Sequence, residues 1–493
     1  MPLNSQFVMG AGSDGESVGQ PLRLANRHGL IAGATGTGKT VTLQRLIETF
    51  SDAGVAVFAA DVKGDLCGLG APGAPQGKVA ERIASMPWLN HQPQAYPLSL
   101  WDVHGQSGHP LRTTLSEMGP LLLGALLELT DSQQAALYAA FKVADREGLL
   151  LLDLKDLKAL LGYLKDNPKA LGEDSALFTG ASAQALLRRL AGLEQQGAEA
   201  LFGEPALQLE DLLHPDPDGR GRVHLLDACR LVHEAPKVYA TFLLWLLAEL
   251  FEQLPERGDA DKPVLALFFD EAHLLFQGTP KALQERLEQV VRLIRSKGVG
   301  VYFVTQSPSD LPDDVLAQLG LRIQHGLRAF TAKEQKALRA VADGFRPNPA
   351  FDSLSVLTEL GIGEALVGTL EDKGTPAMVQ RVAIAPPQSR IGPLNESERA
   401  ALIRQSPLAG RYDKPIDRES AYELLTARAA QAAAEAPTAN ARKKAAAEEQ
   451  GLGQMAGELF GGAMKSALRQ AANQLGRQLV RGLMGSLMGG KKR

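Results

Sequence analysis

The sequence predicts an α/β fold with a mostly parallel β-sheet. Apolar runs of strand length alternate with segments of helical periodicity along much of the chain. A glycine-rich turn joins one such run to a helix-like segment at residues 28–46, and an acidic pair follows a second apolar run at residues 265–269. Strands that alternate with helices pair in parallel through right-handed crossovers, so both features are expected at the carboxyl edge of one sheet.

The composition is typical of a soluble globular protein of about two to three domains. Of the 493 residues, 45% are hydrophobic and 22% are charged. The two cysteines, Cys67 and Cys229, stand far apart and outside any metal-ligand spacing, so we expect neither a disulfide framework nor a zinc site. The first residues lack a signal-peptide pattern, and no run of about 18 apolar residues occurs. We therefore expect a cytoplasmic protein.

The glycine-rich turn matches the phosphate-binding pattern G-x-x-x-x-G-K-[ST]. Its glycines allow backbone N–H groups to surround phosphates, and the next helix adds its positive N-terminal end. Lys39 is predicted to reach the β- and γ-phosphates, and the Thr40 hydroxyl to hold Mg²⁺. The alternative, a flexible loop, does not explain the strand-like "GLIA" before it and the helix-like "VTLQRLIETF" after it. The predicted nucleotide-binding residues are Gly33, Ala34, Thr35, Gly36, Thr37, Gly38, Lys39, Thr40 and Val41.

The acidic pair Asp270-Glu271 ends the apolar run 265–269, which reads as a strand buried on both faces. At the carboxyl edge of a parallel sheet, this pair emerges beside the phosphates. Asp270 is the predicted Mg²⁺ carboxylate, and Glu271 is the predicted general base that polarises the attacking water. The alternative is an acidic pair that stabilises a helix N-terminus, which the phosphate-binding turn makes less favoured.

Two further strand ends carry candidate residues. The run "GVAVFAAD" ends at Asp61, which is predicted to orient the Mg²⁺ shell or the attacking water; alternatively it caps the next turn. The run "GVGVYFVTQ" ends at Gln306, whose amide is predicted to donate to the γ-phosphate or to water. An amide at a strand end can instead satisfy loop backbone, so both alternatives stay open.

Spacing separates the chain from two other classes of phosphate-loop protein. The letters "DEAH" suggest a superfamily-two helicase, but Asp270 follows Lys39 by 231 residues, and no downstream Q-R-x-G-R-x-G-R segment occurs. That interval is longer than the one between the phosphate-binding lysine and the acidic motif in such helicase cores. Nucleoside kinases are small and have arginine-rich lids, whereas helix-like segments fill the interval here.

Five motifs in order resemble the bacterial HerA-like ATPases of the YjgR type, relatives of the HerA/FtsK DNA translocases. They are "NRHGLIAGATGTGKT", "AADVKGD", "FFDEAH", "IRSKGVGVYFVTQSPSDLP" and "LGIGEALVG", within a stretch from about Asn26 to Leu425. The resemblance implies a RecA-like P-loop NTPase core and a homo-oligomeric ring, commonly a hexamer. It also implies ATP and Mg²⁺ as cofactors, and hydrolysis between subunits coupled to DNA movement.

The resemblance also assigns roles to residues. Lys39 and Thr40 bind nucleotide and Mg²⁺, Asp61 and Asp270-Glu271 support hydrolysis, and Gln306 senses the γ-phosphate. One departure is that 32 residues precede Gly33, where archaeal HerA proteins carry a β-barrel. We expect that barrel to be absent, so DNA entry inferred from it does not transfer.

Hydrolysis between subunits needs a cation for the charge that develops on the transferred phosphate. The candidates are Arg292, Arg295, Arg322 and Arg328, with Arg295 as the first choice and Arg292 as the second. The alternative for each is an arginine on a surface helix or strand edge.

The chain divides into six predicted parts. They are a polar leader (1–25), the first part of the core (26–104), an all-α insertion (105–215), the second part of the core with a late hairpin (216–386), an accessory segment (387–428) and an Ala/Gly-rich tail (429–493). The hairpin is expected at the sheet edge. The accessory segment is expected either to wrap a neighbouring subunit or to pack on its own chain.

The tail is basic, whereas the rest of the chain is acidic. Ten Lys or Arg against four Glu give residues 429–493 a charge of +6, which leaves −10 for residues 1–428. Apolar residues at helical spacing predict a basic helix that suits a membrane or a phosphate backbone; they are Met464, Leu468, Leu475, Leu479, Leu483 and Leu487. Its glycines weaken a free helix, so a loosely ordered or subunit-packing tail is favoured over membrane contact.

Three functions are compatible with these motifs. The first is Mg²⁺-dependent ATP hydrolysis in a ring coupled to DNA translocation or unwinding. The second is an ATPase that switches an assembly surface without moving DNA. The third, least favoured, is transfer of phosphate to a small acceptor.

Overall fold

The computed structural model describes residues 6–258, 260–277, 281–329, 331–431 and 433. The chain forms two compact units, Met1–Tyr422 and Glu423–Arg493. The second unit is described at residues 423–431 and 433, which are helical. Most of the predicted Ala/Gly-rich tail, residues 434–493 with the predicted basic helix from Met464, lies outside the described residues.

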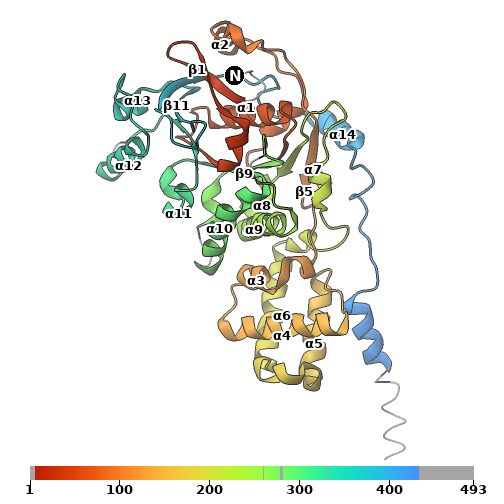
Figure 1. Ribbon diagram of the computed structural model, residues 1–493. Helices are drawn as coiled ribbons and strands as arrows, with labels where there is room; N and C mark the ends of the chain where they lie inside the picture. The colour runs from red at the N-terminus through yellow and green to blue at the C-terminus, as the bar shows by residue number, and fades with distance from the viewer. Residues whose placement is uncertain (1–5, 259, 278–280, 330, 432, 434–493) are drawn as a thin grey trace, which may run out of the picture. The chain divides into compact units, whose positions relative to one another are not determined.

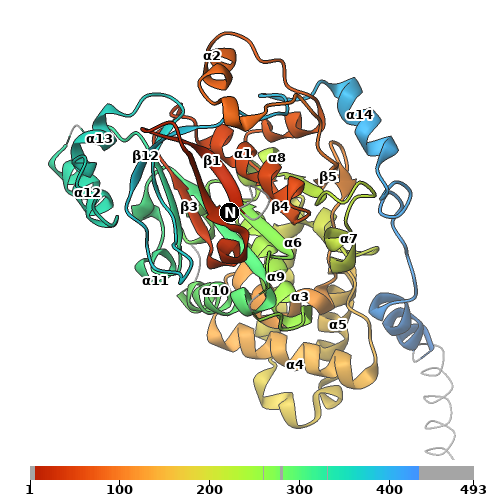
Figure 2. The same cartoon turned by 45° about the horizontal axis from the view of Figure 1, so that its top comes forward.

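A twelve-stranded mixed sheet runs through the described part of the first unit (Figures 1 and 2). Its strand order is β2-β1-β12-β11-β10-β3-β9-β8-β4-β7-β5-β6. The eight strands from β10 to β6 are parallel, and the pairs from β10 to β2 are antiparallel. The predicted α/β fold with a mostly parallel sheet is therefore confirmed.

The strands and helices have the following bounds. The strands are β1 (Gln6–Gly12), β2 (Ser17–Pro21), β3 (Gly29–Ala32), β4 (Ala56–Asp61), β5 (Leu98–Asp102), β6 (His109–Pro110), β7 (Val223–Asp227), β8 (Leu265–Phe269), β9 (Val299–Thr305), β10 (Leu321–His325), β11 (Glu364–Gly368) and β12 (Gln380–Ile384). The helices are α1 (Lys39–Asp52), α2 (Lys78–Ala84), α3 (Leu115–Leu126), α4 (Asp131–Glu147), α5 (Leu154–Asp166), α6 (Gly180–Gln195), α7 (Leu209–Leu213), α8 (Cys229–Glu234), α9 (Pro236–Gln253), α10 (Lys281–Ile294), α11 (Asp313–Leu316), α12 (Ala332–Asp343), α13 (Ser353–Glu359) and α14 (Glu396–Gln405). Among the helices so described, none has the length and apolarity needed to cross a bilayer.

The N-terminal segment differs from the predicted leader. Residues 6–21 form the β1–β2 hairpin, and β1 pairs antiparallel with β12. Phe7 is fully buried, with its ring centroid 5.1 Å from that of Phe50. The prediction was wrong because the Gly/Ser-rich composition of this segment indicates a leader, although it contains the short apolar strand β1. Because β1 and β2 lie beyond β12, the predicted β11–β12 hairpin is inside the sheet and not at its edge.

The core lies on both faces of the parallel strands. On one face, α1 packs against the sheet, and Phe50 contacts Phe268 and Tyr302 at centroid distances of 5.9 and 5.4 Å. The neighbouring positions Phe269 and Phe303 point to the other face, because successive side chains alternate along a strand. Burial on both faces explains why these strands read as continuous apolar runs.

The predicted all-α insertion is helical except at its start. The short strand β6 lies within residues 105–215 and extends the parallel sheet beside β5. The helices α3 to α7 follow, and α3, α4 and α5 begin with capping boxes. A two-residue strand carries too little periodicity to be found from sequence.

The accessory segment packs on its own chain within the described residues. Arg399 of α14 pairs with Asp227 at 2.8 Å, and Asp413 lies 3.0 Å from His109 Nδ1. Tyr412 is fully buried and donates its hydroxyl to Asp211. These contacts agree with packing on its own chain, while the alternative of wrapping a neighbouring subunit stays a prediction.

Candidate nucleotide site

Strand register brings the predicted site residues to one edge of the sheet. Ala32 at the end of β3 pairs with Thr305 at the end of β9, and Phe269 at the end of β8 pairs with Phe303 of β9. Ala60 of β4 pairs with Phe269 in turn. The turn after β3, the acidic pair after β8 and the loops after β4 and β9 therefore leave the sheet at the same edge.

The turn after β3 requires glycine at defined positions. A Cβ atom on Gly33 would lie 2.5 Å from the Cβ of His325, closer than real atoms approach. Gly36 and Gly38 have φ angles of 79° and 111°, which L-residues with a side chain rarely adopt. Since α1 begins at Lys39, the unpaired N–H groups of its first turn face this loop.

The turn is braced by β10 and by the segment before β11. Ala34 N donates to Gly326 O at 3.2 Å, and Gly363 N donates to Thr37 O at 3.0 Å. His325 Nδ1 lies 2.9 Å from Glu364 O, and its Nε2 lies 2.9 Å from the Thr42 hydroxyl. A carbonyl only accepts, so Nδ1 carries the proton and Nε2 accepts from the hydroxyl.

His325 was not predicted from the sequence; it stands in the segment "LRIQHGLRAF". Burial lowers its pKa to about 4, so the ring is neutral at pH 7. Its tight approach to Gly33 and its bond to Thr42 of α1 make it a support for the turn. A lone buried histidine in a sequence carries no signal for such a role.

Lys39 folds back onto the turn. Its Nζ donates to Gly33 O at 2.5 Å and to Ala34 O at 3.0 Å. Burial and the nearby Lys63 lower the pKa of Lys39, whereas Glu271 and Asp270 act in the opposite direction. The lysine of the turn therefore lies in the electrostatic field of the acidic pair, 231 residues away in sequence.

A second lysine, Lys63, lies between the acidic side chains. Its Nζ is 3.3 Å from Glu271 Oε1 and 3.9 Å from Asp270 Oδ2. Burial opposes the charged form, but the two carboxylates outweigh it and raise the pKa of Lys63. Lys63 belongs to the motif "AADVKGD", but its position there predicts no role, because a cation after a strand is more often solvated.

Asp270 and Glu271 have different environments. Asp270 is 6% exposed; burial raises its pKa, although Lys63 lowers it. Its Oδ1 accepts from Glu271 N at 2.9 Å. Glu271 adopts the left-handed conformation, with φ 47°, which is rare for a residue other than glycine and concentrates at functional sites.

The Glu271 carboxylate keeps an unused acceptor. Its Oε2 is buried without a hydrogen bond from the described residues, and the Nδ1 of His273 lies 3.4 Å from it. Thr40, the second residue of α1, adds a half-buried hydroxyl beside the turn. Carboxylate and hydroxyl oxygens are the ligands that Mg²⁺ prefers, so this donor set fits that ion.

Asp61 builds a loop in the structure. Its Oδ1 accepts from Lys63 N at 3.1 Å and from Gly64 N at 2.7 Å, and its Oδ2 accepts from Leu66 N at 3.0 Å. Burial, with the nearby Asp65, raises its pKa to about 6. These contacts correspond to the turn-capping alternative. They also fix the backbone of Lys63, whose N–H is one of the donors. A direct role of Asp61 toward metal or water stays a prediction.

Gln306 follows β9 directly and is exposed. Asp310 orders the loop around it by accepting from the Thr305 hydroxyl at 2.6 Å and from Ser307 N at 3.0 Å. β9 lies between β3 and β8, so this loop leaves the sheet between the phosphate-binding turn and the acidic pair. The structure thus places Gln306 at the predicted edge, while its role as a sensor is not tested.

The sequence model described as "Helicase HerA-like C-terminal" matches residues 6–493, nearly the whole chain. The chain belongs to this HerA-like family. The resemblance inferred from the five motifs is therefore confirmed. A comparison with curated proteins gave no match.

Solved structures of a conjugative coupling protein share the fold of this HerA-like chain. The bacterial conjugative coupling protein TrwBdeltaN70 is 15% identical, with 78% of this chain and 90% of that one covered and a TM-score of 0.52. The plasmid coupling protein TrwB in complex with ADP and Mg²⁺ is 16% identical, with coverage of 76% and 88% and a TM-score of 0.52. VirB4 of Thermoanaerobacter pseudethanolicus is 17% identical, with coverage of 80% and 98% and a TM-score of 0.47.

Three of the four arginine candidates of the HerA-like chain lie away from its own nucleotide edge. Arg292, Arg295 and Arg322 line a cavity of about 450 Å³, together with Arg27 and Arg346. This cavity includes the residues that precede β3 and β10, so it lies at the amino edge of the sheet, opposite the phosphate-binding turn.

The four candidates are not equivalent. Arg322 donates to the carbonyl oxygens of Leu316, Leu319 and Gly344. Its guanidinium therefore holds the backbone of its own chain, in agreement with a structural role. Arg328 is exposed and does not line the cavity; it follows β10 and so lies at the carboxyl edge, with the phosphate-binding turn. Arg292 is exposed, Arg295 is half-buried, and both lie at the amino edge, so these two remain the candidates for a cation that acts on a neighbouring subunit.

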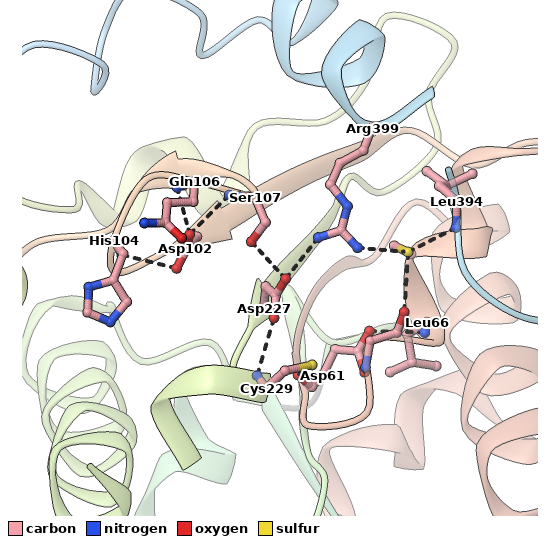
Figure 3. A network of polar contacts seen from close by, with 12 residues as sticks. Asp61, Leu66, Asp102, His104, Gln106, Ser107, Asp227, Cys229, Leu394 and Arg399 are labelled. Carbon is pink, nitrogen blue, oxygen red and sulfur yellow. Dashed lines mark hydrogen bonds and ion pairs between the residues drawn. The ribbon is translucent and has the colours of Figure 1, made fainter. Parts of the chain in front are cut away.

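A second group of carboxylates lies at the carboxyl edge of the sheet, where β7 and β5 end (Figure 3). Asp227 Oδ2 accepts from the Ser107 hydroxyl at 2.7 Å and from Arg399 at 2.8 Å, and its Oδ1 accepts from Cys229 N at 3.2 Å. Arg399 also lies 3.5 Å from the Cys67 sulfur. This network joins α14 to the sheet.

Proposed function

We propose that this HerA-like chain hydrolyses ATP with Mg²⁺ in a ring of identical subunits and couples hydrolysis to translocation or unwinding of DNA. The observation that carries the proposal is the convergence of Lys39, Lys63 and the acidic pair at one sheet edge, beside a glycine turn that suits phosphates. A nucleoside triphosphate brings negative charge and a metal to such a place.

Each residue then has a defined task. Lys39 exchanges its two carbonyl partners for the β- and γ-phosphates, and the N–H groups of the turn bind the same oxygens. Glu271 accepts a proton from the attacking water through its unused oxygen. Asp270 and Thr40 would hold Mg²⁺, which supplies positive charge to the phosphates. Gln306 orients the water or reports the γ-phosphate.

The position of the arginines supports a ring. Arg292 and Arg295 lie at the edge opposite the site, so within one chain they cannot reach its nucleotide. A head-to-tail ring brings the amino edge of one subunit toward the carboxyl edge of the next. In that arrangement Arg295 supplies the cation in trans. TrwB, described in complex with ADP and Mg²⁺ and with an ATP analogue, lends support to the nucleotide and Mg²⁺ in the proposal, not to the ring.

The test is steady-state ATPase activity with and without single-stranded and double-stranded DNA, with a Lys39→Ala control. We expect turnover that requires Mg²⁺, rises with DNA and disappears in Lys39→Ala, together with a ring-sized species in native mass spectrometry. Arg295→Ala is expected to lower turnover by about two orders of magnitude without weakening ATP binding. DNA-independent turnover by a monomer would contradict the motor and favour a nucleotide-switched assembly factor.

A further inference from the structure

A short turn before β11 is attached to the phosphate-binding turn. Gly363 N donates to Thr37 O at 3.0 Å, and a Cβ atom on Gly38 would lie 3.1 Å from Gly363 N. Gly363 itself has a φ of 76°, a conformation that favours glycine. Residues 361–363, the GIG turn, therefore stand directly beside the phosphate-binding turn.

The GIG turn lies on the side of β3 away from the acidic pair. β9 and then β8, which carries Asp270 and Glu271, follow β3 in one direction; β10 and then β11 follow it in the other. A triphosphate whose terminal phosphate points to the acidic pair directs its nucleoside the opposite way. In that orientation, the base of a bound nucleotide would lie on the side of the GIG turn.

Ile362 presents an apolar side chain at this position. It is 74% exposed, the highest value among the large apolar side chains in the described ranges. The turn is held firmly, because Arg82 of α2 donates to Gly363 O at 3.3 Å and to Ile362 O at 3.5 Å. In addition, Glu364 accepts from Gly361 N at 2.9 Å. A pre-ordered apolar group is suited to an aromatic ligand, since little entropy is lost on binding.

We propose that Ile362 contacts the face of the purine base of the bound nucleotide, with Arg82 as the positioning residue that holds the GIG turn against the phosphate-binding turn. This inference rests on the proposed nucleotide site. The contact is apolar and involves the face that adenine and guanine share, so it contributes affinity for purine nucleotides in general.

The test compares a ligand that has a base with one that lacks it. Titration calorimetry of the full chain measures the Kd of ADP and of inorganic tripolyphosphate, each with Mg²⁺. Ile362→Ala is expected to weaken ADP and GDP in parallel by about tenfold, because part of an apolar contact is lost. Tripolyphosphate affinity is expected to stay within about twofold of the original value.

Two further variants separate the base contact from general effects. Ile362→Leu keeps an apolar contact and should bind ADP nearly as well as the original chain. Ile416→Ala removes another exposed isoleucine, 56% exposed, in the accessory segment and should change neither affinity. Thermal unfolding of Ile362→Ala should match that of the original chain because the side chain is exposed.

Three results would overturn the inference. They are unchanged ADP affinity in Ile362→Ala, equal weakening of tripolyphosphate, and an ADP effect that accompanies loss of the ring species in native mass spectrometry. The last result would make Ile362 a subunit contact. If Lys39→Ala left the affinity for both ligands unchanged, the proposed nucleotide site itself would be wrong, which is a different outcome.

Discussion

Two groups of carboxylates lie at the carboxyl edge of the same sheet and differ in how their oxygens are used. Asp102 and Asp227, at the ends of β5 and β7, accept from backbone N–H groups, Ser107 and Arg399. Glu271, after β8, keeps a buried oxygen without a hydrogen bond from the described residues. A carboxylate whose acceptors are all occupied stabilises the fold, whereas one with an unused acceptor is available to a ligand or a proton.

The largest expected effect concerns Glu271. Glu271→Gln keeps the shape of the side chain but removes the proton acceptor, so we expect kcat for ATP hydrolysis to fall by about 10²–10³ while ATP binding persists. Steady-state kinetics and nucleotide titration measure the two quantities. Asp102→Asn is the matched control and should keep kcat within about twofold. If both amide variants lost activity equally, the contrast between the two groups would be incorrect.

The second prediction concerns the structural group. Asp227→Asn removes the charge that holds Arg399, so we expect a loss of about 2 kcal/mol in stability, seen as a drop of several degrees in the thermal unfolding midpoint. ATPase activity per folded molecule should not change. Asp413→Asn, at a carboxylate whose side chain is 44% exposed, is the control and should shift the midpoint little. Loss of turnover without loss of stability would show that Asp227 serves the reaction.

The third prediction concerns Lys63, whose side chain pairs with the acidic pair Asp270-Glu271. Lys63 lowers the pKa of Asp270, so Lys63→Met should raise that pKa and move the acid limb of the pH–activity profile to higher pH. We expect turnover at pH 6 to fall about tenfold, with a smaller loss at pH 8. Lys237→Met, which removes a lysine whose side chain is 55% exposed, is the control. A uniform loss at all pH values would indicate instead that Lys63 acts on the phosphates.

The smallest expected effect concerns Asp61, which lies between the two groups on β4. Its pKa is about 6 in the folded chain, so protonation grows as pH falls through 6 and removes an acceptor from the loop that carries Lys63. Asp61→Asn lacks that acceptor at every pH. We expect about threefold lower turnover at pH 7.5 and a difference that vanishes below pH 6. A constant ratio across the pH range would argue for direct action on metal or water.

Much of the site was predictable because its signals are local. The phosphate-binding turn needs glycines and a lysine at set spacing, and the strands before Asp61, Asp270 and Gln306 are apolar because both sheet faces are covered. Lys63 and Ile362 stood in quoted motifs but were not assigned, and His325 stood outside them. Their roles depend on neighbours from distant strands, which no single segment of the chain reveals.

The sequence by itself determined the identity of the elements: a phosphate-binding turn, buried parallel strands and an acidic pair. These follow from backbone conformation and burial within a few residues. Tertiary structure alone decided the strand order, the inclusion of the β1–β2 hairpin in the sheet and the place of Arg292 and Arg295 at the opposite edge. The physical reason is that pairing between strands joins residues hundreds of positions apart, so which oxygens are occupied and which stay available is settled only when the sheet is assembled.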